Sequence, residues 1–291
     1  MQTIHTVAWM KQVAADARRK EHILGLVPTM GALHEGHLSL IREAQKQCSP
    51  MVVSIFVNPK QFGPSEDLKN YPRTFETDRK TLKQLGVDYL FAPSAEEIYP
   101  SGFSTAVVVE GLSDRLEGKS RPGHFRGVAT VVLKLFEIVQ PRFAFFGRKD
   151  AQQVRIIRQL TRDLNLDTEL MVCPIVREPN GLALSSRNAL LSDAQRQAAT
   201  ALYRSLVAAR DEIRSGERSP AIILSSLRKV IDSEPRVALD YAEIADAETF
   251  EPVITLARES YILIAARVGD TRLIDNALIE PDENGTFTVS I

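Results

Sequence analysis

The chain has 291 residues, of which 44% are hydrophobic, 25% charged and 7% aromatic. This is the usage of an ordinary globular protein of about two domains, and it excludes a disordered chain, a fibrous repeat and a small disulfide-stabilised domain. The 36 Lys and Arg residues against 37 Asp and Glu give a formal net charge of -1. No net field attracts a polyanion, so we expect binding neither to nucleic acid nor to a membrane surface.

Neither a targeting segment nor a membrane span is expected from the sequence. In residues 1–20 the basic residues follow the apolar ones, the reverse of a secretory signal. No run reaches the roughly 18 consecutive apolar residues of a transmembrane helix. The two cysteines, Cys48 and Cys173, lie in apolar or amphipathic stretches, which is typical of reduced thiols. We therefore expect a soluble protein of the cytoplasm.

Short apolar runs alternate with amphipathic helical stretches through residues 1–175, the first predicted domain. Thr74 is a candidate helix N-cap, Gly86 a candidate left-handed C-cap, and Pro141 a helix stop. The alternation predicts βαβ units and hence an α/β fold with a Rossmann-like, doubly wound parallel sheet. The predicted strands span Ile23–Val27, Met51–Val57, Val87–Phe91, Thr105–Val109, Phe143–Phe146 and Thr168–Cys173, and the predicted helices span His37–Cys48, Thr74–Leu85, Gly127–Gln140 and Asp150–Asn165.

The texture of the sequence changes after Cys173. Residues 174–189 contain two prolines, a glycine and several polar turn formers, which indicates a linker or a functional loop. Residues 193–214 and 219–232 are predicted helices, and Gly269-Asp270 is typical of a two-residue hairpin turn. Residues 176–291 are therefore predicted to form a smaller C-terminal α+β domain. Its strands form a meander at Leu239–Ile244, Tyr261–Val268, Thr271–Ala277 and Thr286–Ile291.

The first βα junction carries two glycines, Gly31 and Gly36, and two histidines, His34 and His37. Ligands of open α/β sheets lie at the carboxyl ends of the strands, where a helix N-terminus attracts phosphate. The glycines let backbone amides approach an anion, and the imidazoles can donate to it. A zinc site is one alternative, although spacing suggests no third ligand. A tight turn with two solvated histidines is another. The dinucleotide fingerprint is absent, because four residues separate the glycines.

Residues 28–37 read PTMGALHEGH, and five further blocks follow in order as far as residue 190. Together they resemble the pantothenate synthetases, which are pantoate–β-alanine ligases. His34-x-Gly36-His37 is similar to the HIGH motif of the wider nucleotidyltransferase superfamily. The later blocks are FVNPKQFG (56–63), YPR (71–73), SRPGHFRGV (120–128), FFGRKDAQQ (145–153) and LSSRN (184–188).

The resemblance implies an ATP-dependent, AMP-forming ligase of pantothenate and coenzyme A biosynthesis. The carboxylate of (R)-pantoate attacks the α-phosphate of ATP to give pantoyl adenylate and pyrophosphate, and β-alanine then displaces AMP. The resemblance also implies Mg2+ bound with ATP, and a homodimer. It assigns catalysis to His34, His37 and Lys149, which supply positive charge and hydrogen bonds. The ATP site is assigned to Met30, Gly31, Ala32, Leu33, His34, Glu35, Gly36, His37, Gly147, Arg148, Lys149, Asp150, Val176, Leu184, Ser185, Ser186 and Arg187.

Two glutamines, Gln61 and Gln153, match the family's pantoate-binding positions. A glutamine amide both donates and accepts, which suits a ligand that presents hydroxyl and carboxylate groups. Without the surrounding motifs, both would be interpreted as surface glutamines. The apolar residues Met30, Phe56 and Phe62 either form a wall for the gem-dimethyl group of pantoate or belong to the core.

A Gly/Pro-flanked loop contains Arg121 and His124, and it either covers the site as a flap or is merely solvated. At the phosphate motif Arg148 stands where the family usually has Glu, a change of two charge units. Asp150 is the nearest carboxylate for a metal, whose ligands the sequence leaves unknown.

Two other classes of function compete with a ligase. A nucleotidyltransferase would stop at nucleotidyl transfer, and the FVNPKQFG block argues against it. A binding protein that had lost its chemistry would have damaged His, Lys or Ser-Ser-Arg positions, and here these are intact. Because residues 1–175 contain Lys149 and residues 176–291 contain Ser185, Ser186 and Arg187, we expect ATP to bridge the two domains, with the second domain acting as a lid.

Overall fold

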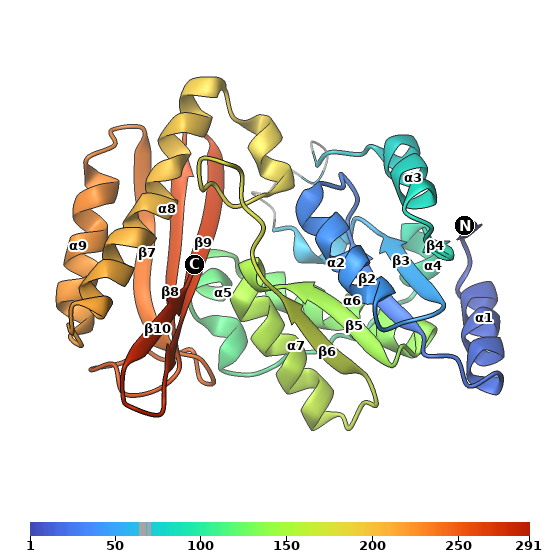
Figure 1. The fold of residues 1–291 in the computed structure, drawn as a ribbon. Coiled ribbons are helices and arrows are strands. Elements are labelled where there is room, and N and C mark those ends of the chain that lie inside the picture. Colours follow the sequence, from blue (N-terminus) through green and yellow to red (C-terminus); the bar gives the residue numbers. More distant parts are fainter. Residues whose placement is uncertain (64–67, 69–70) are drawn as a thin grey trace. The chain divides into compact units, whose positions relative to one another are not determined.

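The computed structural model describes residues 1–63, 68 and 71–291. They form two compact units (Figure 1). The first unit comprises Met1–Arg148 and Gln152–Pro174, and the second comprises Lys149–Ala151 and Ile175–Ile291. The sequence-based division at residue 175 places Lys149 in the first domain, whereas in the structure it belongs to the second unit.

A six-stranded parallel sheet forms the centre of the first unit, with strand order β1-β4-β3-β2-β5-β6. The order reverses next to β2, because β3 lies on one side of β2 and β5 on the other. Such a reversal marks the ligand-binding edge of open α/β sheets, at the carboxyl ends of the strands. The predicted doubly wound sheet is thus confirmed. The strands are β1 (Gln2–Ile4), β2 (Gly25–Thr29), β3 (Met51–Ile55), β4 (Tyr89–Phe91), β5 (Phe143–Gly147) and β6 (Glu169–Cys173).

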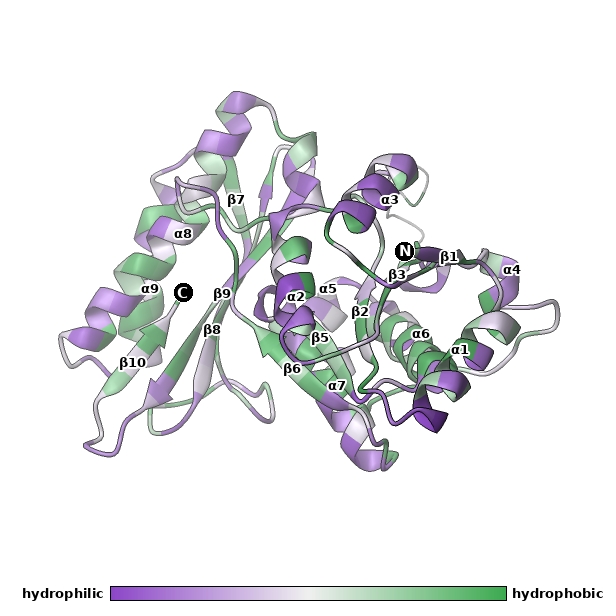
Figure 2. Cartoon of the chain, turned by 45° about the vertical axis from the view of Figure 1, so that its right-hand side comes forward, coloured by the Kyte–Doolittle hydropathy of each residue, from purple (hydrophilic) through white to green (hydrophobic). Residues whose placement is uncertain are grey.

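Helices cover both faces of this sheet because its strands are apolar on both faces. Leu26 packs into one cluster with α1, α6 and α7, and its neighbour Val27 packs into another with α2 and α3. This alternation follows from the two-residue period of a strand. In Figure 2, α6 is mostly in apolar colours and α3 mostly in polar ones. The helices are α1 (Val7–Arg19), α2 (Glu35–Gln45), α3 (Phe75–Gln84), α4 (Ala95–Ile98), α5 (Glu117–Ser120), α6 (His124–Val139) and α7 (Ala151–Asp163).

The predicted strand at Thr105–Val109 is wrong. These residues have no regular secondary structure, and the N–H of Val107 donates to the hydroxyl of Thr130 on α6 over 2.9 Å. Val108 is half exposed, whereas Val109 is buried. A run of β-branched residues favours extended backbone, but a strand also needs a neighbour to pair with. Here a helix side chain satisfies the backbone instead.

The second unit packs two helices against an antiparallel sheet, as the predicted α+β meander requires. Its strand order is β10-β9-β8-β7, and Val268 pairs with Thr271 across the predicted turn. Gly269 has φ +60°, the positive value that such turns need. One face of the sheet and the inner sides of both helices form a single apolar core. The elements are α8 (Asp193–Arg214), α9 (Pro220–Asp232), β7 (Val237–Asp246), β8 (Ser260–Val268), β9 (Thr271–Pro281) and β10 (Phe287–Ser290).

Both cysteines are free thiols, as predicted, and both are buried in the cluster that contains α2 and α3. Burial raises the pKa of Cys48 to about 11. Burial, with a further contribution from Glu43, raises the pKa of Cys173 to about 11. Because the thiolate is the reactive form, these thiols are inert at neutral pH.

Candidate active site

The HxGH turn, defined as residues 30–37, is held by a buried carboxylate from α3. Gly31 and Ala32 have φ +82° and +51°, which sends the chain sharply away from β2. The N–H groups of Ala32 and Leu33 donate to Asp78 Oδ2 and Oδ1 over 2.9 and 3.0 Å. Asp78 is buried, and the sequence alone gives no sign of it, since it is one of several charged residues in an amphipathic helix. Both amides are committed to Asp78.

The two motif histidines stack against each other at the N-terminus of α2. His34 is the N-cap residue, and the two ring centroids lie 4.1 Å apart. The N–H of His34 donates to His37 Nδ1 over 3.4 Å. A neutral ring that accepts at Nδ1 carries its proton on Nε2, so His37 is oriented as an Nε2 donor. The positive end of the helix dipole favours an anion at the same place.

Glu35, which the resemblance assigns to the ATP site, is paired with Arg42, seven residues later on α2. Arg42 Nη1 donates to Glu35 Oε1, and both side chains are about half exposed. The hydrogen bond from Arg42 holds the pKa of Glu35 below its ordinary value, although burial opposes this. In this structure the Glu35 side chain forms an exposed ion pair with Arg42 on the surface of α2.

Gln61 is buried, so its interpretation as a surface glutamine is wrong. Its amide Nε2 donates to Met30 Sδ over 3.1 Å, and its Oε1 accepts from Asn58 Nδ2 over 3.0 Å. The hydroxyl of Tyr99 donates to Asn58 Oδ1 over 2.8 Å, and burial raises the pKa of Tyr99, which keeps that donor protonated. The FVNPKQFG block therefore fixes the orientation of the Gln61 amide.

His124 is the first residue of α6 rather than part of a solvated loop. It is buried, and its Nδ1 donates to the backbone oxygen of Gln61 over 2.9 Å. Its Nε2 lies 3.0 Å from Arg121 Nη1, which makes Nε2 the acceptor. A Cβ at Gly127 would lie 2.3 Å from the backbone oxygen of Lys60, so only glycine lets α6 approach this segment so closely. The SRPGHFRGV block therefore packs against the backbone of Lys60 and Gln61 and helps to hold Gln61 in place.

The residues considered for the pantoate pocket fall into two groups. Phe56 belongs to the apolar core of the first unit, whereas Met30 and Phe62 are partly exposed. Gln153 is also partly exposed. Its neighbour Gln152 is buried, where its Nε2 donates to the carbonyls of Leu112 and Arg115 over 2.8 and 2.9 Å. Gln152 is thus structural, and Met30 and Phe62 are the apolar residues with surface left for a ligand.

In the second unit, the SSR loop, defined as residues 176–188, folds back on itself before η4 (Ser186–Leu190). Leu184 N donates to the carbonyl of Val176 over 3.0 Å. Ser185 is the N-cap of η4, and its Oγ accepts from the N–H of Arg187 over 3.2 Å. The Ser185 hydroxyl therefore helps to shape the loop.

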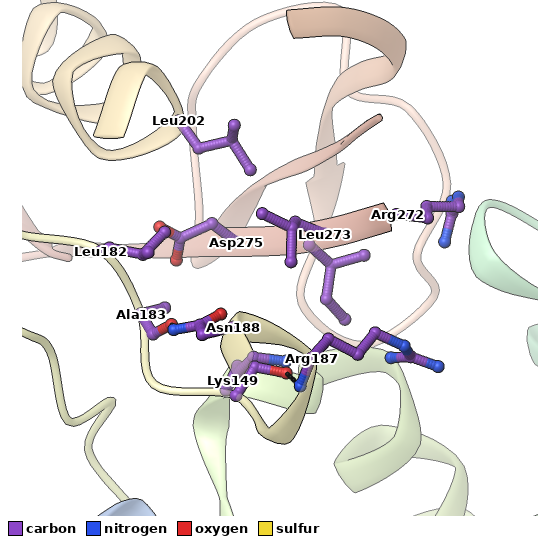
Figure 3. Close-up of a pocket in the computed structure, with 11 residues that line it drawn as sticks. Lys149, Leu182, Ala183, Arg187, Asn188, Leu202, Arg272, Leu273 and Asp275 are labelled. Carbon is purple, nitrogen blue, oxygen red and sulfur yellow. Dashed lines mark hydrogen bonds between the residues drawn. The ribbon is translucent and has the colours of Figure 1, made fainter. Parts of the chain in front are cut away.

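Lys149 comes together with Ser185 and Arg187 within the second unit. All three line one small cavity of about 10 Å³, which has room for about one water molecule. In Figure 3, Lys149, Arg187 and Asn188 lie along one side of the cavity, below Leu273 and Asp275 of β9. The lysine and arginine bring positive charge to one place, but the enclosed space cannot contain a nucleotide. A triphosphate would have to bind at its surface.

Among the residues that the structure describes, no group of three His, Cys, Asp or Glu side chains is placed to hold a metal ion. Lys149 Nζ lies 3.8 Å from Asp150 Oδ1, so the Asp150 carboxylate is paired with the neighbouring lysine.

No helix in the described part of the chain is long and apolar enough to cross a membrane.

A parallel sheet whose order reverses beside β2, with a histidine pair at the helix that follows β2, defines an α/β enzyme of the nucleotide-binding class. Residues 2–278 match the family model for pantoate-beta-alanine ligase. Pantothenate synthetase of Thermotoga petrophila is 53% identical over 279 residues, which cover 96% of this chain and 100% of that protein. The enzyme of Koribacter versatilis is 50% identical over 284 residues, or 98% of each chain.

Solved structures agree with these relatives. Pantothenate synthetase from Thermus thermophilus superposes with a TM-score of 0.90 at 45% identity, covering 95% of this chain and 98% of that one. Pantoate-beta-alanine ligase from Francisella tularensis, complexed with beta-gamma ATP and beta-alanine, gives 0.78 at 37% identity, with 95% and 97% covered. The chain belongs to the pantoate–β-alanine ligase family, as its motifs predict.

Proposed function

We propose that this ligase joins pantoate to β-alanine through an enzyme-bound pantoyl adenylate. In the first step a pantoate carboxylate oxygen bonds to the α-phosphorus of ATP, and pyrophosphate leaves with the electrons of the broken P–O bond. In the second step the β-alanine nitrogen bonds to the acyl carbon, AMP leaves and the nitrogen loses a proton. The observation that carries this proposal is the bond from the His34 N–H to His37 Nδ1, which orients the His37 ring at the N-terminus of α2.

His37 and the start of α2 would stabilise the negative charge that develops on the α-phosphate. A preorganised donor is worth most where charge appears only in the transition state. His34 caps the helix and stacks on His37, which supports a role in orienting it. Lys149 and the SSR loop would hold the rest of the triphosphate with an ammonium, a guanidinium and loop hydroxyls.

Gln61 would orient pantoate. Its Nε2 currently donates to the thioether of Met30, and sulfur is a weak acceptor. Exchanging that contact for a substrate hydroxyl or carboxylate is therefore favourable. The other end of the Gln61 amide stays fixed by Asn58, so the donor arrives in one orientation.

Mg2+ fits this donor set as an ion bound mainly by the triphosphate. Magnesium keeps most of its waters and needs only one or two carboxylates, and Asp150 offers one beside Lys149. When bound, the ion would neutralise charge on the phosphate oxygens.

We also propose a homodimer in the cytoplasm. The buried free thiols and the use of ATP support that compartment, and light scattering tests the dimer.

Pyrophosphate release tests the two-step reaction. We expect ATP, Mg2+ and pantoate to release one equivalent of pyrophosphate per enzyme without β-alanine, and β-alanine to convert the trapped adenylate to pantothenate and AMP. Strict dependence of pyrophosphate release on β-alanine in a single turnover contradicts an adenylate intermediate. The expectation that ATP bridges two domains through Lys149 and the SSR loop loses its basis, because both belong to the second unit. We keep a lid role for residues 176–291 as a proposal. It predicts a smaller radius of gyration with an unreactive ATP analogue, and unchanged small-angle scattering contradicts it.

A further inference from the structure

Two consecutive polar residues are buried in β9 of the second unit. Asp275 and Asn276 are 3% and 1% exposed. Successive residues of a strand point to opposite faces of the sheet, so the pair reaches in two directions from one place. Buried polar groups are expensive unless they find partners. The partners of these two side chains are the two segments that carry the candidate phosphate-binding groups.

Asn276 holds the segment of Lys149. Its Nδ2 donates to the backbone carbonyl of Lys149 over 2.9 Å. This contact spans 127 residues of sequence, and both of its residues belong to the second unit. Because the bond is to the main chain, it fixes the origin of the lysine side chain while leaving the ammonium available.

Asp275 holds the SSR loop. It pairs with Arg177 in a bidentate ion pair, with distances of 2.7 and 2.9 Å. Arg177 Nη1 also donates to the carbonyl of Gly181 over 3.0 Å, across the turn of the loop. Gly181 has φ +92°, and a Cβ there would lie 2.1 Å from the ring of Tyr203. The loop is therefore packed against both β9 and α8.

A second ion pair fixes the far end of the same loop. Arg196 Nη1 lies 3.1 and 3.2 Å from the two oxygens of Glu178, and Glu178 Oε1 accepts from Asn188 Nδ2 over 3.0 Å. Arg196 Nη2 also donates to the carbonyl of Asn188. Asn188 directly follows Arg187. Once Asp275 has fixed the start of the loop, these bonds determine where Ser185 and Arg187 can lie.

We propose that Asp275 and Asn276 are positioning residues that set the distance between Lys149 and the Ser185–Arg187 end of the SSR loop. The inference rests on the proposed function, in which both segments hold the same triphosphate. The two residues are adjacent on a rigid strand, so neither segment can shift without breaking a bond to β9. A mutation far from the reacting atoms that misplaces a group by about 1 Å can slow an enzyme about 100-fold. We expect the loss of Asp275 or Asn276 to slow the reaction by up to this factor.

The test uses the full chain and single-turnover pyrophosphate release. We expect Asn276→Leu, which keeps the branched shape, adds bulk and removes the donor, to slow adenylation about 10- to 100-fold. The KM for pantoate and the rate at which β-alanine consumes preformed adenylate should stay within about twofold, since neither involves the triphosphate. Ser205→Ala is the matched control: it removes a buried hydroxyl of the same unit, bonded within its own helix, and should leave adenylation unchanged.

Urea unfolding of each variant separates positioning from loss of fold. If Asn276→Leu does not fold, Asn276→Asp, which also lacks an N–H donor, replaces it and should show the same slow adenylation. Equal adenylation rates in folded variants and wild type overturn the proposal, as does a matching loss in the β-alanine step. If wild type releases no pyrophosphate without β-alanine, the two-step function fails instead. The positioning role is then judged by a rise in the KM for ATP, and an unchanged KM overturns it.

Discussion

The HxGH turn and the SSR loop are both held by carboxylates, of which Asp78 and Asp275 are buried and Glu178 is partly exposed, but in different ways. Asp78 accepts main-chain N–H groups from the HxGH turn, whereas Asp275 and Glu178 bind the arginine side chains of Arg177 and Arg196 at the SSR loop. A carboxylate that accepts hydrogen bonds from backbone N–H groups fixes the backbone directly. An ion pair fixes it through a long side chain, and both charges must be present to offset their desolvation. The two loops should therefore fail differently.

Arg177→Met should give the largest loss of stability. Asp275 would remain in a buried site without its partner, and breaking such a pair typically costs about 3–5 kcal/mol. Urea unfolding at pH 7 measures the change. The double variant Arg177→Met/Asp275→Leu removes both charges and should recover most of the loss. Equal stability of the single and double variants would mean that the uncompensated charge is not the cause.

His37→Ala should leave stability nearly unchanged and slow single-turnover adenylation about 100-fold, the usual effect of losing one transition-state donor. The comparison predicts this separation, because Asp78 accepts two amides of the HxGH turn over 2.9 and 3.0 Å, whereas His37 accepts one over 3.4 Å. His22→Ala, which removes an exposed histidine outside the turn, is the matched control and should retain the wild-type rate. An unchanged rate in His37→Ala removes His37 from the site.

Asp78→Asn should lower the free energy of unfolding by about 1–3 kcal/mol, the cost of leaving a buried donor without an acceptor. The single oxygen of the new amide still accepts a hydrogen bond from one backbone N–H. Its NH2 group faces the other backbone N–H and cannot accept from it. Adenylation should slow as well, because the turn then loses its fixed φ angles. Glu76→Gln on the exposed side of α3 is the control and should change little. A variant as stable as wild type would show that the turn holds itself.

Glu35→Gln should have the smallest effect, and it should depend on pH and salt. Arg42 lowers the folded-state pKa of Glu35 below the ordinary value of 4.5. The stabilisation is thus fully present above that value and is lost as the pH falls through the lowered pKa. The variant should be slightly less stable than wild type at pH 7, and the difference should shrink as the pH falls through the lowered pKa of Glu35. The difference at pH 7 should vanish in about 1 M salt; a difference that survives salt contradicts a surface pair.

The predicted elements show where sequence is informative. The α8 helix begins and ends as expected at residues 193 and 214, because its capping box and apolar spacing are local. The resemblance assigns Gln61 to pantoate, which stays a prediction. Its burial depends on α6 and on Tyr99, and no local pattern reveals those contacts. The failure at Thr105–Val109 has the same origin, since the strand's partner is missing and Thr130 takes its place.

Short-range periodicity, turn chemistry and contiguous motifs were enough to predict the parallel α/β sheet, the C-terminal meander, the free thiols and the family. The assignment of individual residues to ATP and pantoate remains a set of predictions. Only the tertiary structure revealed Asp78 behind the HxGH turn and the bonds from Asp275 and Asn276 to the SSR loop and Lys149. Those side chains act across 45 to 127 residues of sequence, and hydrogen bonds over such separations exist only once the strands and helices have packed.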